Sequence, residues 1–188
     1  MERDRGVAQP GSAPASGAGG RWFKSSRPDQ FPRWQIGVVG GGQCPPAVER
    51  LAQATGEAIA QAGAVLICGG LGGVMSAAAR GAHLAGGLTV GILPGSAHKD
   101  ANPFVDVVVV TDMGHARNAL VARSSHALIA FAGEYGTLSE IALALKIGIP
   151  VIALDHWTHL AGVIKAGTPG DAVALALASA ERAHIRPR

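Results

Sequence analysis

Short runs of consecutive apolar residues alternate along the chain with longer segments in which apolar positions recur every three or four residues. The short runs are rich in Val, Ile, Leu and Ala and are apolar at nearly every position, which is typical of strands buried on both faces of a sheet. The longer segments have a helical period and stop at glycine. We therefore predict strands at 35–39, 64–68, 88–93, 105–110, 127–132 and 150–154, and helices at 45–63, 73–85, 115–125, directly behind Thr137 and at 171–185.

This alternation of strand and helix predicts the fold class. Continuously apolar strands separated by helices form a parallel sheet with helices on both faces. Because crossover connections are right-handed, the expected architecture is a doubly wound, Rossmann-like α/β fold in a single domain of residues 34–188. Residues 1–33 are rich in Gly, Ala, Ser and Pro without any period, so we predict a disordered N-terminal extension there.

The net charge of +3 and the isoelectric point near 9.2 raise the question of nucleic-acid binding. The whole excess lies in residues 1–33, whereas residues 34–188 hold ten basic and ten acidic side chains. The predicted domain therefore lacks the net basic charge that is typical of duplex binding, and we expect no nucleic-acid partner.

The apolar runs are too short to cross a bilayer. The run near the carboxyl end is interrupted by Lys146, Gly148 and Pro150, whereas a spanning helix needs about 20 apolar residues. The first residues do not form an apolar leader, and the two cysteines, Cys44 and Cys68, lack the spacing of a metal site or a disulfide framework. We expect no membrane partner, no bound metal and a cytoplasmic protein.

Glycines gather at the carboxyl ends of four predicted strands, where a doubly wound sheet binds its ligands. Glycine lets the backbone turn tightly and approach a ligand with its N–H groups free, and the following helix favours an anion at its N-terminus. One such loop is explained by turn geometry alone, but four on one edge predict an anion site, most naturally for a phosphate. The loops are Gly40-Gly41-Gly42, Gly69-Gly70-Leu71-Gly72-Gly73, Met113-Gly114-His115 and Gly133-Glu134-Tyr135-Gly136. None of them fits the full GxGxxG or GxxxxGK[ST] spacing.

The sequence Thr137-Leu138-Ser139-Glu140 stands immediately before an apolar helical run. The pattern predicts a capping box, in which Thr137 is the N-cap of the helix and Glu140 reaches back to the threonine N–H. The same position would also place the Glu140 carboxylate beside the ligand edge, where it could act on a sugar or on water. The two interpretations are compatible, and the motif alone does not separate them.

Three segments resemble the LOG-like superfamily, whose hallmark is PGGxGTxxE with an upstream MHxRK. They are "GGLGGVM" (69–75), "GHARN" (114–118) and "GEYGTLSEIALALKIGIPVI" (133–152). The resemblance extends over residues 35–154. It is closer to a small bacterial and algal branch that includes the molybdenum cofactor carrier proteins, which share GxYGTLSEIALAL and the pattern GILPG…ANPxVD, here 91–106.

The resemblance implies a Rossmann-like homo-oligomer, a dimer or tetramer, that binds a phosphorylated small molecule. The ligand would be a nucleoside monophosphate or the molybdenum cofactor. In LOG enzymes the reaction is hydrolysis of the N-glycosidic bond of nucleoside 5′-monophosphates, so Arg117 and Glu140 are the catalytic candidates if the chain is an enzyme. The ligand-binding candidates are Gly40, Gly41, Gly69, Gly70, Gly72, Gly73, Met75, Pro94, Asn118, Gly133, Gly136 and Thr137.

Two departures from the enzyme pattern favour the carrier branch. The PGG of the hallmark is replaced by Ala132-Gly133-Glu134, which adds a carboxylate, and MHxRK becomes Met113-Gly114-His115-Ala116-Arg117-Asn118, which loses the lysine. We therefore expect a nucleotide- or pterin-binding carrier first, and a nucleoside 5′-monophosphate phosphoribohydrolase as the alternative. A purely structural interaction module would leave the glycine-rich edge unexplained.

Overall fold

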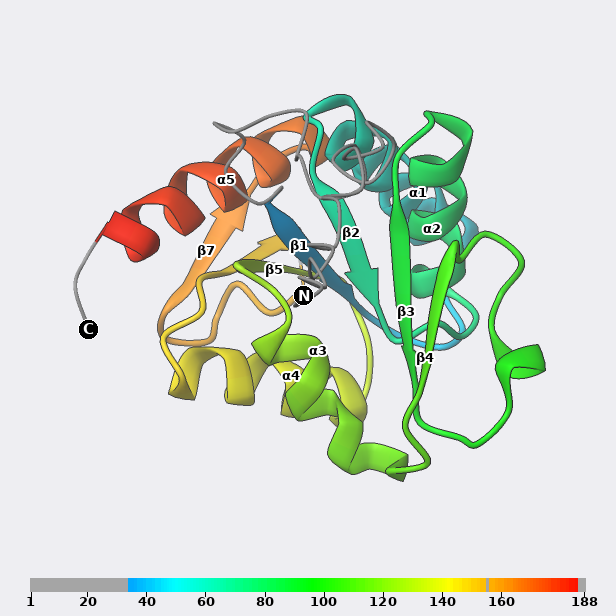
Figure 1. Cartoon of the computed structure of the whole chain (residues 1–188). Helices are drawn as coiled ribbons and strands as arrows, with labels where there is room; N and C mark the ends of the chain where they lie inside the picture. The colour runs from blue at the N-terminus through cyan, green and yellow to red at the C-terminus, as the bar shows by residue number, and fades with distance from the viewer. Residues whose placement is uncertain (1–33, 155, 186–188) are drawn as a thin grey trace, which may run out of the picture. The chain divides into compact units, whose positions relative to one another are not determined.

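The computed structural model describes residues 34–154 and 156–185, so the predicted extension, residues 1–33, lies outside the described part of the chain. Within that part, seven strands form one all-parallel sheet in the order β4-β3-β2-β1-β5-β6-β7 (Figure 1). The strands are β1 (Gln35–Val39), β2 (Val65–Cys68), β3 (Thr89–Leu93), β4 (Val107–Val110), β5 (Ala127–Ala130), β6 (Val151–Leu154) and β7 (Val163–Ala166).

The strand order contains one reversal of direction, at β1. The chain first builds outward from β1 through β2 and β3 to β4, and then returns to add β5, β6 and β7 on the other side of β1. In register, Ile36 of β1 pairs with Leu66 on one side and with Ala127 on the other. This topology confirms the predicted doubly wound fold, and such a sheet binds ligands at the switch point beyond its strand ends, here between β1 and β5.

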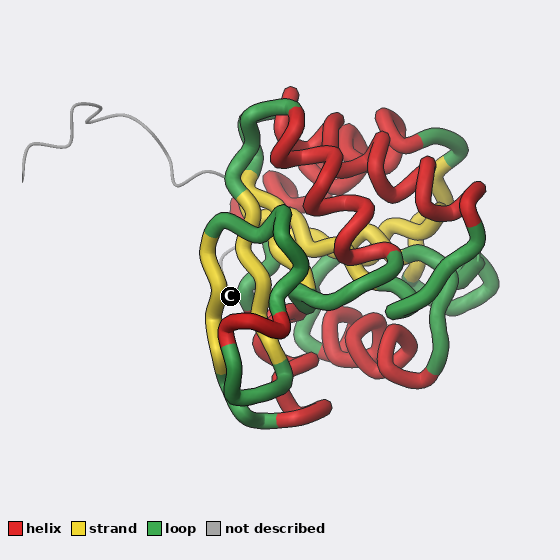
Figure 2. The backbone as a smooth tube through the Cα atoms, turned by 90° about the vertical axis from the view of Figure 1, so that its right-hand side faces the viewer, coloured by secondary structure: helices red, strands yellow, loops and turns green. Residues whose placement is uncertain are grey.

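Helices cover both faces of the sheet (Figures 1 and 2). One face packs against α1 (Pro46–Gln61), α2 (Val74–Leu84) and α5 (Pro169–Ile185), and the other against α3 (Asn118–Arg123) and α4 (Tyr135–Lys146). Two hydrophobic cores result. In β1, Ile36 and Val38 enter the first core, whereas Val39 enters the second, as the alternation of side chains along a strand requires.

The helices α1 and α2 pack so closely that glycine is required on both. A Cβ on Gly56 of α1 would lie 1.9 Å from the carbonyl oxygen of Ala78, and a Cβ on Gly81 of α2 would lie 1.9 Å from that of Gln53. Arg80 extends across the same contact and donates to Glu49 at 2.9 Å and to Gln53 at 2.7 Å. The two helices therefore form a rigid unit behind β1 and β2.

The segment before β5 and the last strand differ from the sequence prediction. The segment predicted as one helix at 115–125 is a 3-10 turn, Gly114–Arg117, followed by the short α3. The edge strand β7 was not predicted, because only two of its residues, Val163 and Ile164, are large and apolar, and Lys165 faces solvent. No helix in the described residues is long and apolar enough to cross a membrane.

The close contact between α1 and α2 can be tested with Gly81→Ala. The added methyl group meets backbone rather than a flexible side chain, so the helices must separate, and overpacking of this kind costs roughly 1–3 kcal/mol of unfolding free energy. Gly170→Ala in α5 is the matched control, because its Cβ meets no atom within 4 Å. Urea denaturation should show a clear loss for Gly81→Ala only; equal effects of the two substitutions would contradict the close packing.

Candidate functional site

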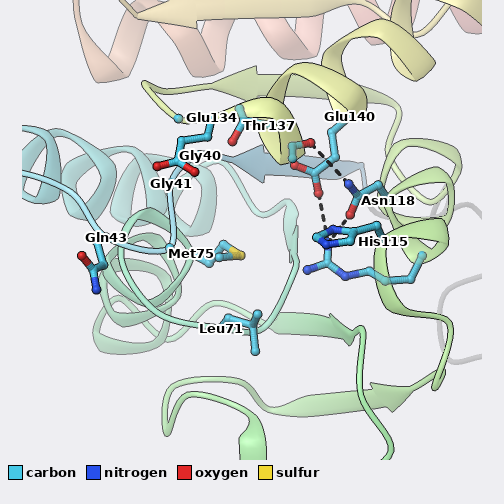
Figure 3. Close-up of a pocket in the computed structure, with 14 residues that line it drawn as sticks. Gly40, Gly41, Gln43, Leu71, Met75, His115, Asn118, Glu134, Thr137 and Glu140 are labelled. Atoms are coloured by element: carbon cyan, nitrogen blue, oxygen red, sulfur yellow. Dashed lines mark hydrogen bonds and ion pairs between the residues drawn. The ribbon is translucent and has the colours of Figure 1, made fainter.

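A cavity of about 440 Å³ opens at the carboxyl edge of the sheet, at the switch point between β1 and β5 (Figure 3). Its walls come from loops that are far apart in the sequence. The β1–α1 loop contributes 40–43, and the β2–α2 region contributes Leu71 and Met75. The turn before α3 contributes His115 and Arg117, and α3 itself contributes its first residue, Asn118. The opposite wall is formed by residues of the β5–α4 loop and of α4, namely Gly133, Glu134, Gly136, Thr137 and Glu140.

The N-terminus of α4 opens into this cavity without a side-chain cap. The helix begins at Tyr135 with Glu134 at the N-cap position, and the first helical hydrogen bond runs from Leu138 N–H to the Glu134 carbonyl. The N–H groups of Tyr135, Gly136 and Thr137 precede that bond, so they have no partner within the helix. These free donors give the cavity an anion-binding character.

The predicted capping box is therefore wrong. Thr137 lies inside the first turn of α4 and not at its N-cap, and it is buried. Glu140 lies in the second turn, where its carboxylate pairs with Arg117 and does not reach back to the threonine N–H. The helix starts earlier than predicted because Glu134, in extended backbone conformation, already ends the loop after β5.

Gly133 is required by the close approach of two loops. A Cβ at this position would lie 2.2 Å from the Thr137 hydroxyl and 2.9 Å from the Gly41 nitrogen. The same approach lets Gly41 N–H donate to the Ala132 carbonyl at 2.9 Å. The loop after β1 and the loop after β5 are thus fastened together at the switch point, which fixes the two glycine-rich walls of the cavity.

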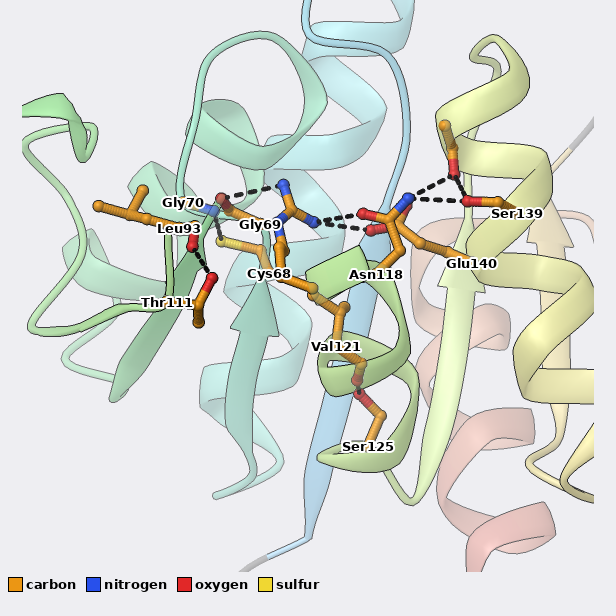
Figure 4. Close-up of polar contacts among 12 residues, drawn as sticks. Cys68, Gly69, Gly70, Leu93, Thr111, Asn118, Val121, Ser125, Ser139 and Glu140 are labelled. Carbon is orange, nitrogen blue, oxygen red and sulfur yellow. Dashed lines mark hydrogen bonds and ion pairs between the residues drawn. The ribbon is translucent and has the colours of Figure 1, made fainter. Parts of the chain in front are cut away.

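A buried ion pair between Arg117 and Glu140 lies in the wall of the cavity (Figure 3). Arg117 Nη1 donates to Glu140 Oε1 at 3.0 Å, and both residues are 6% exposed. Arg117 Nη1 also donates to Asn118 Oδ1 at 3.1 Å, and Nη2 donates to the Gly69 carbonyl at 3.4 Å (Figure 4). Asn118 in turn donates to the Ser139 hydroxyl at 2.7 Å. The network connects the end of β2, the turn before α3 and the helix α4.

Glu140 is poised to gain or lose a proton near neutral pH. Burial raises the pKa of its carboxyl to about 7, while the charge and the hydrogen bond of Arg117 act in the opposite direction and only partly offset the burial. A carboxyl with such a pKa can serve as a general acid or base if a substrate reaches it.

The structure brings nine of the predicted site residues to the cavity wall. They are Gly40, Gly41, Met75, Arg117, Asn118, Gly133, Gly136, Thr137 and Glu140. The other predicted residues are not among those that line it. Gly73 lies at a neighbouring hollow, and the Pro94 carbonyl accepts a hydrogen bond from Gly114 N–H at 2.9 Å. Gly70 and Gly72 belong to the loop that carries Leu71.

Gly69 acts beneath Arg117 and not at the cavity surface. A Cβ there would lie 2.5 Å from Arg117 Nη2 and 2.7 Å from the Met75 sulfur. The missing side chain therefore leaves the space in which the guanidinium lies. Sequence reasoning placed this glycine on the ligand, because a glycine after a strand gives the same signal whether a ligand or an arginine approaches it.

Five lining residues were not among the predicted ligand contacts: Gly42, Gln43, Leu71, His115 and Glu134. Leu71 and Met75 give the cavity an apolar wall. Glu134 contributes a carboxylate that points toward Gly40 and Gly41 (Figure 3), and it makes no ion pair with any described residue. Its position directly after Gly133 was the signal that could have identified it.

The raised pKa of Glu140 predicts a pH dependence of stability. The folded state keeps its proton up to about pH 7, whereas the unfolded chain loses it near the ordinary value of 4.5. The stabilisation that the folded state gains from keeping Glu140 protonated is therefore complete below about pH 4.5, and it is lost as pH rises through 7. Glu140→Gln lacks this titration, so the unfolding free energy of wild type minus that of the variant should fall between pH 5 and 8 in urea denaturation.

Arg117→Met provides the second arm of this test. It leaves the carboxyl buried without its partner, so the decline should shift to higher pH and stability at pH 8 should drop by about 3–5 kcal/mol. A constant difference between wild type and Glu140→Gln across the range would show that Glu140 does not titrate there.

Known proteins resemble this chain over most of its length. An uncharacterized protein of Archaeoglobus fulgidus is 50% identical over 146 residues, which cover 77% of this chain and 95% of that protein. A cytokinin riboside 5′-monophosphate phosphoribohydrolase of Mycobacterium marinum is 32% identical over 152 residues, which cover 74% of this chain and 80% of that enzyme.

Solved structures share the fold. A molybdenum cofactor binding protein of Rippkaea orientalis is 39% identical with a TM-score of 0.75, covering 79% of this chain and 98% of that one. A Moco carrier protein of Chlamydomonas reinhardtii is 33% identical with a TM-score of 0.73, covering 80% and 99%. The model of the SLOG cluster4 family matches residues 33–183. These matches confirm the resemblance to LOG-like proteins, and the chain belongs to the SLOG cluster4 family.

Proposed function

We propose that this protein binds a phosphorylated nucleotide or pterin nucleotide, with the molybdenum cofactor as the leading candidate, and holds it without turnover. The observation that carries the proposal is the uncapped N-terminus of α4, which opens into the cavity at the switch point. The sequence similarity to a molybdenum cofactor binding protein and to a Moco carrier protein, at 39% and 33% identity, supports the ligand class.

The cavity walls suggest how such a ligand would lie. The free N–H groups at the start of α4 and the Thr137 hydroxyl would hold the phosphate, because helix N-termini with adjacent glycines bind phosphate groups. Leu71 and Met75 form an apolar surface suited to a flat heterocycle, while polar groups at the edges set orientation. The volume of about 440 Å³ lies in the range of small-molecule sites.

The charges of the cavity favour binding over catalysis. Arg117 is the only arginine or lysine among the described residues that line it, and it is already paired with Glu140. Glu134 adds an unpaired carboxylate. A hydrolase must stabilise charge that develops in the transition state, and here the one fixed cation is already engaged. A phosphorylated ligand can still be held by the backbone donors of α4.

The alternative function is hydrolysis of the N-glycosidic bond of a nucleoside 5′-monophosphate. It is favoured by the position of Glu140 in the cavity and by its pKa of about 7, which suits a general base. The mycobacterial relative that is 32% identical is a phosphoribohydrolase. In this alternative Glu140 activates water or stabilises the sugar cation, and Arg117 orients it.

The two functions are separated by incubating the purified full chain with AMP, GMP and CMP. We expect binding without release of ribose 5-phosphate, and mass spectrometry of the native protein should identify a copurifying phosphorylated pterin or nucleotide. Glu134→Gly, which removes the unpaired carboxylate, should tighten GMP binding about tenfold at low salt. Release of ribose 5-phosphate that disappears in Glu140→Gln would overturn the carrier proposal in favour of the hydrolase.

We further propose that the chain forms a homo-oligomer, a dimer or tetramer, in the cytoplasm. Cys44 and Cys68 form no disulfide, which supports a reducing compartment. On the α3/α4 side of the sheet, β3 and β4 have no helix in front of them among the described residues (Figure 1). Val107 and Val109 of β4 are 45% and 41% exposed on that side, and such apolar surface is typical of an interface.

The oligomer proposal is tested with Val109→Lys. A lysine on this strand face would place a charge inside a subunit contact, so light scattering after size exclusion should report a smaller species than for wild type. Val110→Thr on the opposite side of the same strand is the control. An unchanged mass for Val109→Lys, or a monomeric wild type, would contradict the interface.

A further inference from the structure

A second hollow lies next to the proposed ligand cavity. Its volume is about 330 Å³, and it shares Gly42 and Gln43 with the first cavity. The rest of its wall comes from Cys44 in the loop before α1, from Glu49 in α1, from the N-cap Gly73, and from Ser76, Ala77 and Arg80 in α2. The two spaces are therefore contiguous over the loop that follows β1, and a volume of this size exceeds what a phosphate group alone would fill.

The first turn of α2 supplies free backbone donors to this hollow. Gly73 is the N-cap without a side-chain cap, and the first helical bond runs from Ala77 N–H to the Gly73 carbonyl. Val74 N–H donates to the Gly41 carbonyl, which leaves the N–H groups of Met75 and Ser76 without an acceptor in the described residues. Because Gly73 and Ser76 both line the hollow, these donors lie at its wall.

Two side chains of α2 add further donors. Ser76 and Arg80 are four residues apart and thus lie on one helix face. Both hydrogen bonds of Arg80 use Nη2, so its Nη1 makes none to the described residues. Glu49 is the one carboxylate in this wall, and its charge is balanced by Arg80 at 2.9 Å. The hollow is therefore close to neutral, with unused N–H and O–H donors and an open helix N-terminus.

We propose that this hollow is a subsite for a second phosphate and the group attached to it, so that the site as a whole accepts a ligand with a pyrophosphate bridge. The proposal rests on the function proposed above. The first phosphate would lie at α4, and the bridge would cross Gly42, where no side chain obstructs it. The second phosphate would accept hydrogen bonds from Ser76, Arg80 Nη1 and the first turn of α2.

The chain contains a reporter for occupancy of the hollow. Cys44 lines it and is half-buried, whereas Cys68, the other cysteine of the chain, is fully buried in the first core. Burial and the nearby Glu49 raise the pKa of the Cys44 thiol, so alkylation by iodoacetamide is best followed near pH 9. A ligand in the hollow should shield Cys44, while a ligand confined to the first cavity should not.

The experiment compares GMP, GDP and diguanosine 5′-pyrophosphate with the full chain, because guanine has the same amino-oxo-pyrimidine ring as a pterin. GDP and the dinucleotide should bind at least about tenfold more tightly than GMP and slow Cys44 alkylation about tenfold, whereas GMP should leave the alkylation rate within about twofold. Ser76→Ala and Arg80→Gln should each reduce the ratio by which GDP binds more tightly than GMP, and they should leave the affinity for GMP unchanged. Arg50→Gln, at an exposed position of α1 outside the hollow, should retain the gain.

The outcomes separate this proposal from the function itself. Equal affinity for GMP and GDP, or a gain that persists in both Ser76→Ala and Arg80→Gln, would overturn the subsite while leaving the first cavity as the ligand site. If none of the nucleotides binds, the proposed function fails for this ligand class. In that case the rate of Cys44 alkylation is compared in inorganic pyrophosphate and in inorganic phosphate. Slower alkylation in pyrophosphate alone supports the subsite, and equal rates in the two anions reject it.

Discussion

The buried ion pair between Arg117 and Glu140 is the interaction on which the candidate site depends. Removing two charges from water costs several kcal/mol per ion, and attraction repays this only when further hydrogen bonds complete the geometry. Here the carbonyl oxygens of Asn118 and Gly69 accept from the same guanidinium. Arg117 Nε remains buried without a partner in the described residues. The arrangement is therefore costly, which is typical of sites maintained for function.

The strand order explains why this pair can form at all. Arg117 lies in the connection from β4 to β5 that makes the reversal of direction, and Glu140 lies in α4, which follows β5. At that reversal, neighbouring loops leave the sheet on opposite faces, and a crevice opens between them. Gly133 and Gly41 let the two loops touch across the crevice, so its walls are set by backbone contacts and not by side-chain packing.

The fold could be predicted from the sequence because local patterns of apolar residues indicate most of its strands and helices. Strands buried on both faces are apolar at nearly every position, and the five inner strands of the described sheet, β3, β2, β1, β5 and β6, follow that rule. The two edge strands differ from each other: β4 consists of four consecutive valines although Val107 and Val109 are exposed, whereas β7 includes the exposed Lys165. Tertiary packing, and not local propensity, stabilises β7, so its sequence carries little signal.

The site could be predicted only in part, because its chemistry depends on contacts between distant segments. The motif from Thr137 to Glu140 has the local form of a capping box, but a partner 23 residues away draws Glu140 into an ion pair. At α5 a threonine does cap the helix: the Thr168 hydroxyl accepts from Asp171 N–H at 3.1 Å and donates to the Asp171 carboxylate at 2.7 Å. The two threonines differ because α5 begins at Pro169, directly after Thr168, whereas α4 already begins at Tyr135, before Thr137.

The ion pair also makes the charge of the cavity depend on its ligand. When Glu140 is ionised it cancels Arg117, and Glu134 leaves the wall with a net negative charge. When Glu140 is protonated it no longer neutralises Arg117, so the positive charge of Arg117 offsets the negative charge of Glu134. A phosphate held near this carboxyl would disfavour its ionised form and raise its pKa further. Ligand binding would therefore be accompanied by proton uptake, and release would be favoured when the proton leaves. If the protein holds its ligand without converting it, as proposed, such coupling would supply a route to release that an enzyme obtains from its reaction.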